Sequence, residues 1–273
     1  MGDIVNAIIL GIIEGLTEFL PISSTGHMIL AQPLLGVDDA DPKWRVFLFV
    51  IQVGAIGAVI VYFWRDLWKR IVLARRVKLR DHLLTKLAVA VAPAIVLGML
   101  FNDFMEERLE SGPFAPYAVA GALIVGALLM AVIDRGFRRK AALTLDDVTL
   151  RHALIIGVAQ CLSMWPGTSR SMATIMAGIF IGLPATVAAQ FSFLLAIPTM
   201  LLAAVYRTWK YRADLTMDSA AIILVGSLTA FVVALLVVDR FMKYIRTHRF
   251  TPFVVYRIAL GIAVLIFARR YYS

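Results

Sequence analysis

Six long apolar runs, separated by short polar stretches, constrain this chain more than any other feature. About 20 apolar residues in a helix span the roughly 30 Å of hydrocarbon in a bilayer. Only 16% of the residues are charged, against about 25% in a typical soluble domain. We therefore predict an all-α integral membrane protein with six full transmembrane helices. They are expected near residues 46–64, 87–102, 117–134, 186–206, 219–238 and 253–268.

Motifs that recur in the same order in both halves indicate that the chain contains an internal repeat. Each half begins with a broken apolar segment, 4–36 or 153–183, and continues with three spans. A Pro/Ser/Gly turn interrupts each broken segment, and irregular backbone at membrane depth requires burial in protein or a wet cavity. We predict one membrane domain, 1–273, made of two inverted repeats (about 1–145 and 146–273) with two re-entrant helix-loop-helix segments. The paired motifs are Gly11-x-x-Glu14 with Gly157-x-x-Gln160, Pro21-x-x-Ser24 with Pro166-x-x-Ser169, Phe47–Phe49 with Phe191–Phe193, and Pro113–Tyr117 with Pro252–Tyr256.

The distribution of basic residues predicts the orientation. Three crossings per half place the loops 65–86, 135–152 and 239–252 on one side, and these hold 17 of the 27 Lys and Arg residues. The positive-inside rule makes that side cytoplasmic, so both termini are expected to face outward. The same rule accounts for the net charge of +9, and we expect no nucleic-acid partner. The two broken segments then enter from opposite faces, and their tips meet near the midplane.

Two carboxylates in the first broken segment are the first candidates for chemistry. Glu14 and Glu18 are four residues apart on one helix face, where like charges repel. A charge at membrane depth costs at least roughly 2.5–3.5 kcal/mol, so it usually marks function. A cation, a bound metal or a shared proton would offset the repulsion. The alternative is a structural ion pair between the repeats, with Arg170 as the partner.

The turn that follows offers hydroxyls and an imidazole. Ser24 and His27 are candidates for an activated nucleophile and a proton carrier. Ser23 and Thr25 also fit simple caps of the next half-helix. If a helix starts here, its N-terminal N–H groups and Gly26 form an anion site.

The second turn repeats this pattern with a guanidinium in place of the imidazole. Arg170 is suited to bidentate binding of phosphate oxygens. Two helix N-termini, an Arg, two Glu and a His together suit a diphosphate and its metal. Arg257, in the last span, fits either a side chain that reaches outward or one that pairs internally. The residues predicted to bind phosphate are Ser23, Thr25, Gly26, Gly167, Thr168, Ser169, Arg170 and Ser171.

At these two turns the sequence resembles the bacterial undecaprenyl pyrophosphate phosphatases of the bacitracin-resistance type. The matching motifs are EGLTEFLPISSTGH at 14–27 and PGTSRS at 166–171. The resemblance implies hydrolysis of undecaprenyl diphosphate to the monophosphate, the lipid carrier of peptidoglycan synthesis. It also implies the bacterial inner membrane and a site open to the outer face. The implied catalytic residues are Glu14, Glu18, Ser24, His27 and Arg170.

The resemblance also implies a divalent cation, Mg²⁺ or Ca²⁺, which Glu14 and Glu18 would help to hold. Ser24 attacks the terminal phosphorus with help from Glu18, or an activated water attacks directly; both routes fit the sequence. The expected partners are the polyprenyl diphosphate and membrane lipids, and the choice between a monomer and a homodimer is left open.

Two other classes of protein fit parts of the pattern. The acid-phosphatase-like lipid phosphatases have a Pro-Ser-Gly-His motif, but they need a second His six residues after the Arg, where this chain has Met176. A transporter or flippase for polyprenyl phosphates would use the same inverted repeats and midplane site. Phosphate release by pure protein separates a phosphatase from a strict transporter.

Overall fold

A computed structural model describes residues 2–38, 41–73, 78–105, 114–137, 142–214 and 217–271. Within these ranges all regular structure is helical, which confirms the predicted all-α class. Some residues used in the sequence argument, such as Pro113 of the fourth motif pair and parts of the basic loops 65–86 and 135–152, lie outside the described ranges.

Six of the described helices are long and apolar enough to cross a membrane, which confirms the predicted number of spans. Their starts agree with the predicted ones to within a few residues. Local sequence explains two of these starts: Asp41 accepts a hydrogen bond from the Lys43 amide at 2.9 Å, and a proline occupies the first turn of α3 and of α6. The six are α3 (Pro42–Tyr62), α5 (Leu83–Met105), α6 (Ala115–Gly136), α9 (Ala185–Lys210), α10 (Met217–Tyr244) and α11 (Thr251–Tyr271).

Each predicted broken segment is a pair of short helices joined by a loop. The first pair is α1 (Gly2–Thr17) and α2 (Ser24–Leu34), and we call residues 18–23 loop 1. The second pair is α7 (Leu150–Gln160) and α8 (Arg170–Phe180), joined by the 3-10 turn η5 (Cys161–Met164) and residues 165–169, which we call loop 2. That these pairs re-enter a bilayer, and that the halves are repeats, stay predictions.

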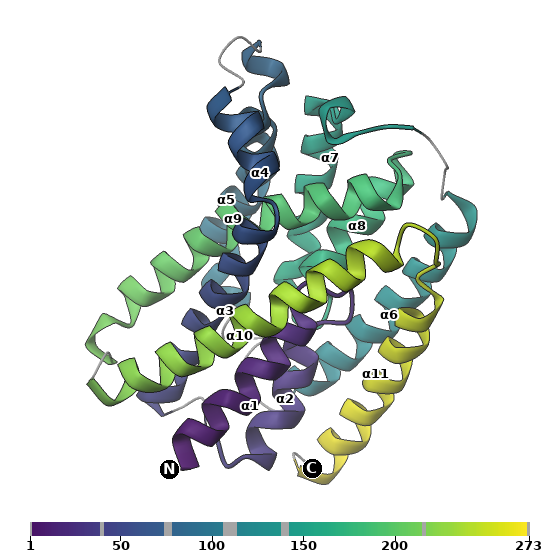
Figure 1. The fold of residues 1–273 in the computed structure, drawn as a ribbon. Coiled ribbons are helices and arrows are strands. Elements are labelled where there is room, and N and C mark those ends of the chain that lie inside the picture. Colours follow the sequence, from purple (N-terminus) through teal and green to yellow (C-terminus); the bar gives the residue numbers. More distant parts are fainter. Residues whose placement is uncertain are drawn as a thin grey trace.

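The remaining elements are short connections on either side of the long helices. Figure 1 shows both termini at one end of the molecule and α4 with α7 towards the opposite end, as the predicted topology requires. The connections are α4 (Trp64–Leu67), η1 (Trp68–Leu73), η2 (Leu79–Asp81), η4 (Leu145–Asp147) and η6 (Arg212–Asp214).

The helix pairs are held by the long helices around them. The helix α1 packs on α10, which also packs on α3, while α7 packs on α5 and α8 packs on α9. The helices α6 and α11 lie side by side (Figure 1) and both contact α2. Both loops are therefore enclosed by helices from both halves of the chain.

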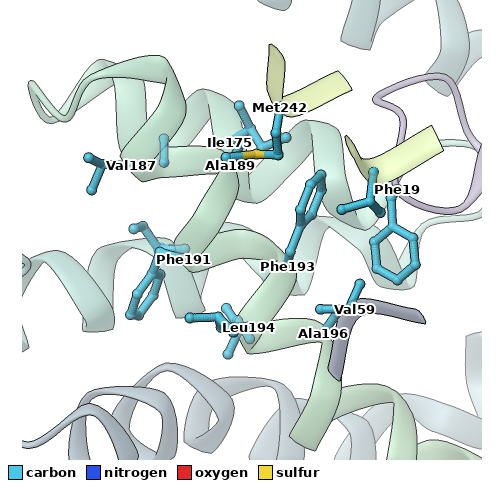
Figure 2. Packing of buried hydrophobic residues seen from close by; sticks show 14 of the residues in the cluster. Phe19, Val59, Ile175, Val187, Ala189, Phe191, Phe193, Leu194, Ala196 and Met242 are labelled. Atoms are coloured by element: carbon cyan, nitrogen blue, oxygen red, sulfur yellow. The ribbon is translucent and has the colours of Figure 1, made fainter. Parts of the chain in front are cut away.

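Phe19 anchors loop 1 in the largest apolar cluster of the protein. Its ring is fully buried and meets the Phe193 ring of α9 edge-to-face, with 5.3 Å between centroids. Figure 2 shows these two rings next to each other, with Val59 and Ala196 below them. Phe193 in turn contacts Phe241 of α10. The residue next to Glu18 is thus fixed by aromatic packing rather than by backbone structure alone.

We expect Phe19→Ala to destabilise the protein by about 3–5 kcal/mol, because it removes a buried ring from a packed cluster. Unfolding of the purified protein in detergent measures this loss. Phe114→Ala is the control, because Phe114 is 74% exposed and its removal should change stability by no more than about 0.5 kcal/mol. Equal effects of the two substitutions would contradict an anchoring role for Phe19.

Candidate active site

Loop 1 ends in a strained serine that starts α2. Ser23 has φ of 72°, a region that non-glycine residues rarely adopt, and its hydroxyl accepts a hydrogen bond from the Gly26 amide at 3.4 Å. Ser24 is therefore the first residue of α2. Ser23 acts as the cap that the sequence allowed, while the Thr25 side chain is exposed.

Loop 2 has the same construction. Ser169 has φ of 70°, and its hydroxyl accepts a hydrogen bond from the Met172 amide at 3.3 Å. Arg170 is therefore the first residue of α8. The helix starts pair Ser23 with Ser169 and Ser24 with Arg170, one position away from the motif match, which paired Ser24 with Ser169. Two such backbone outliers at matching places indicate a functional constraint.

An ion pair joins the two loops. Arg170 Nη2 lies 3.2 Å from Glu18 Oε1, and the two side chains are only 9% and 10% exposed. The other carboxylate oxygen, Glu18 Oε2, accepts a hydrogen bond from the Ser24 hydroxyl at 2.8 Å. One carboxylate thus connects the first residue of α2 with the first residue of α8.

Further contacts orient Arg170. Its Nη1 donates to the Ser192 carbonyl at 3.0 Å, and Nη2 also contacts Met200 Sδ at 3.3 Å. The Phe19 ring lies 5.6 Å from its Cζ. Its Nε has no hydrogen-bond partner among the described residues. The guanidinium is held in place while one N–H donor remains to bind a ligand.

Glu14 lies one turn before Glu18 on α1 and is 3% exposed. The charges of both Glu18 and Arg170 act on its carboxyl group, and its Oε1 has no partner in the described part of the chain. Gln160, which the predicted repeat pairs with Glu14, also has one unpartnered buried atom, Nε2. Because unpartnered buried polar atoms are rare, each such atom needs an explanation, and an absent ligand is one.

His27 is held through both of its ring nitrogens. Nδ1 lies 2.7 Å from the Ser23 carbonyl, which can only accept, so Nδ1 carries the proton. In the neutral ring Nε2 then accepts from the Tyr256 hydroxyl at 2.7 Å, and the two rings stack with centroids 5.6 Å apart. Sequence reasoning missed Tyr256, because it lies 229 residues away on α11.

The other predicted phosphate-binding residues differ in how much of their hydrogen bonding is already used. Ser171 is fully buried and donates to the Leu20 carbonyl of loop 1 at 2.8 Å. The Ser169 and Ser171 hydroxyls are 3.0 Å apart. Thr168 is half-buried in loop 2 beside the buried Gly167. Phosphate binding by Ser23, Thr25, Gly26 and these residues stays a prediction.

The structure decides between the two interpretations of Arg257. It is fully buried and points inward, where its guanidinium donates to main-chain carbonyls of loop 1, loop 2 and α6. The cost of a buried charge marks this residue in the sequence, but its partners lie too far away in the chain to be predicted.

The arrangement can activate a hydroxyl against an anionic phosphorus centre. Ser24 is hydrogen-bonded to a carboxylate that could take its proton, and that carboxylate is oriented by a third group, Arg170. A nucleophile, a base and a group that orients the base are the usual parts of covalent catalysis. An arginine and two helix N-termini add the positive charge that phosphoryl transfer needs.

Comparisons with known proteins cover nearly the whole chain. The model of the family described as bacitracin resistance protein BacA matches residues 7–263. The chain is 42% identical to the undecaprenyl-diphosphatase of Polaromonas sp. (strain JS666) over 96% of this chain and 94% of the relative. It is 44% identical to that of Verminephrobacter eiseniae over 97% and 95%, and 42% identical to that of Campylobacter jejuni over 98% and 94%.

We expect Tyr256→Phe to lower turnover roughly fivefold to tenfold, the worth of one hydrogen bond of about 1 kcal/mol. In ¹⁵N-histidine NMR, Nδ1 of His27 should stay protonated while the Nε2 signal moves towards that of a free acceptor nitrogen. Tyr206→Phe is the matched control, because Tyr206 is exposed on α9. An unchanged Nε2 signal in Tyr256→Phe would show that the hydroxyl does not hold the ring.

Proposed function

This chain belongs to the family of the bacitracin resistance protein BacA, and we propose that it hydrolyses undecaprenyl diphosphate to undecaprenyl phosphate and inorganic phosphate. The matching relatives are undecaprenyl-diphosphatases over nearly their full length. The product would be reused as the lipid carrier of cell-wall synthesis.

The observation that carries this proposal is the Ser24–Glu18–Arg170 chain of contacts. It places a hydroxyl and a cation suited to binding phosphate each within hydrogen-bond distance of one carboxylate, although the residues come from different halves of the sequence. These groups suit transfer of a phosphoryl group.

We propose that the diphosphate replaces Glu18 on Arg170. A phosphate group binds an arginine fork as well as a carboxylate does, and Arg170 Nε is already without a partner. This exchange would leave the Glu18 carboxylate beside the Ser24 hydroxyl, free of the ion pair and placed to accept a proton.

In the covalent route, Ser24 Oγ attacks the terminal phosphorus and gives its proton to Glu18. The Oγ–P bond forms, the bridging P–O bond breaks, and the prenyl monophosphate leaves. Water then attacks the phosphoserine, which releases phosphate and returns the proton to Ser24. In the direct route, Glu18 activates a water instead and Ser24 only binds a phosphate oxygen. The hydrogen bond between Ser24 and Glu18 favours the covalent route.

His27 is proposed to act as a proton carrier for the leaving group or for the second water. It would have to exchange its bond to Tyr256 for one to the substrate, because the Ser23 carbonyl occupies its other nitrogen. A histidine held in one tautomer has a defined nitrogen available for this exchange.

A divalent cation, Mg²⁺ or Ca²⁺, would fit beside Glu14 and Glu18. The described residues contain no cluster of three His, Cys, Asp or Glu side chains that could hold a metal by themselves. Mg²⁺ commonly binds one or two carboxylates together with substrate phosphates and waters, and Glu14 Oε1 is buried without a partner. The cation would neutralise charge on the diphosphate.

The proposed location is the bacterial inner membrane, with the site open to the outer face. Six spans with both termini at one end support this topology, and the basic loops are concentrated on the opposite side. Membrane lipids would surround the exposed apolar helix faces.

We expect purified wild-type protein in detergent to release phosphate from undecaprenyl diphosphate only when Mg²⁺ or Ca²⁺ is added. Arg170→Ala should lower the rate about 10²–10³-fold, as the loss of a group that stabilises transition-state charge does. Arg212→Ala, at an exposed arginine of η6, serves as the control and should keep full activity. If folded wild-type protein releases no phosphate with either metal, the hydrolase proposal is wrong and a transport function for the same site becomes the better account.

We expect Ser24→Ala to reduce turnover by at least about 10³-fold if Ser24 is the nucleophile. Substrate labelled in its terminal phosphate, quenched in acid during turnover, should leave label on Ser24 of the wild type. Thr229→Ala is the control, because the half-buried Thr229 hydroxyl bonds to the Val225 carbonyl within α10, outside the proposed site. Robust turnover by Ser24→Ala would instead establish the direct water route.

A further inference from the structure

Arg257 is bonded to both loops at once. Its Nη1 donates to the Pro21 carbonyl of loop 1 at 3.3 Å, and its Nη2 donates to the Gly167 carbonyl of loop 2 at 3.3 Å. Two further bonds, to the Ala122 carbonyl at 3.0 Å and the Leu123 carbonyl at 3.2 Å, fix the guanidinium on α6. A single side chain of α11 thus contacts three other parts of the chain.

The position of this charge is energetically costly. Arg257 is 0% exposed, and the ion pairs of the described residues include no carboxylate that faces it. Burying an arginine at membrane depth costs at least roughly 2.5–3.5 kcal/mol on insertion scales, and apolar residues often replace buried charges without loss of stability. Packing alone therefore does not account for an arginine at this position.

Two glycines allow the close packing around the guanidinium. A Cβ added to Gly126 of α6 would overlap Arg257 Nη2. A Cβ added to Gly167 would lie 2.6 Å from the Val119 carbonyl oxygen, so loop 2 lies directly against α6. Arg257 and loop 2 are therefore both packed closely against α6.

The two loop carbonyls occupy equivalent places relative to the proposed active residues. Pro21 lies three residues before Ser24, and Gly167 lies three residues before Arg170. A shift of either carbonyl is therefore passed along a short loop to the first residue of α2 or of α8. The Ser24–Glu18–Arg170 contacts span the same gap between the loops.

We propose that Arg257 is a positioning residue that clamps the two loops at the spacing required for phosphoryl transfer, an inference that rests on the function proposed above. The substrate need not touch it. Its effect is exerted through the alignment of Ser24 and Glu18 with Arg170. A misplacement of about 1 Å in such an arrangement can cost roughly 100-fold in rate.

The test combines kinetics with amide hydrogen exchange measured by mass spectrometry on the intact protein in detergent. Arg257→Met removes the hydrogen-bond donors and keeps a long, unbranched side chain. Arg257→Lys keeps the charge but cannot form the same set of bonds to both loops. Lys86→Met is the matched control, because Lys86 is also buried, at 3% exposure, and donates to the Asp146 carbonyl at 2.9 Å. Lys86 lies on α5, outside both loops.

We expect Arg257→Met to lower kcat about 100-fold while KM changes by less than about threefold. Exchange should accelerate in residues 18–24 and 166–170 and stay at the wild-type rate in α3 and α9. Arg257→Lys should remain at least about tenfold below the wild type in kcat, with faster exchange in at least one loop. Lys86→Met should leave kcat and the exchange of both loops unchanged.

The proposal is overturned if Arg257→Met keeps wild-type kcat and wild-type exchange in both loops. It is also overturned if Arg257→Lys restores both, because charge alone would then suffice. If Arg257→Met fails to fold, the lysine variant decides the question. Since exchange needs no substrate, a wild type that releases no phosphate would count against the proposed function alone, and the exchange data would still test the clamp.

Discussion

The Glu18–Arg170 ion pair is the interaction on which the rest of the site depends. It joins residues 152 positions apart, and both side chains are nearly buried. In such surroundings the attraction has to offset the loss of hydration of two charges, and removal of one partner leaves the other uncompensated. Loops 1 and 2 must therefore meet closely, and α1, α2, α7 and α8 must end or begin where they do for this to happen.

Bringing two irregular loops together at depth raises a second requirement, because their carbonyl groups need donors. Polar side chains, which in the sequence look like functional residues, supply some of these donors. Ser171 donates to the Leu20 carbonyl, His27 to the Ser23 carbonyl, and Arg257 to the Pro21 and Gly167 carbonyls. By contrast, Glu14 and Arg170 retain polar atoms without partners among the described residues. The polar residues near the loops thus divide into those that complete the loops and those that keep an unpartnered atom, which we propose for ligand binding.

This division explains how much of the fold and of the site could be predicted from the sequence. The six spans were predictable because apolar length and charge spacing are local properties, and the cost of buried charge identified Glu14, Glu18, His27, Arg170 and Arg257. The sequence could not predict which of these residues bind substrate. That depends on partners far away in the chain, such as Tyr256 for His27 and α6 for Arg257. The positive φ of Ser23 and Ser169, which shifts the match between the halves by one residue, has no signal in residue type either.

That shift brings out how the two halves differ. Ser24 and Arg170 are both the first residue of a half-helix, each after a serine cap of the same geometry. Both positions lie where the helix dipole favours an anion, so the backbone alone would suit either end of a diphosphate equally. Hydrolysis of only the terminal phosphate requires the two ends to be treated differently. The hydroxyl and carboxylate proposed as nucleophile and base at one helix start, and the cation at the other, would provide that difference while both helix starts keep the same serine cap.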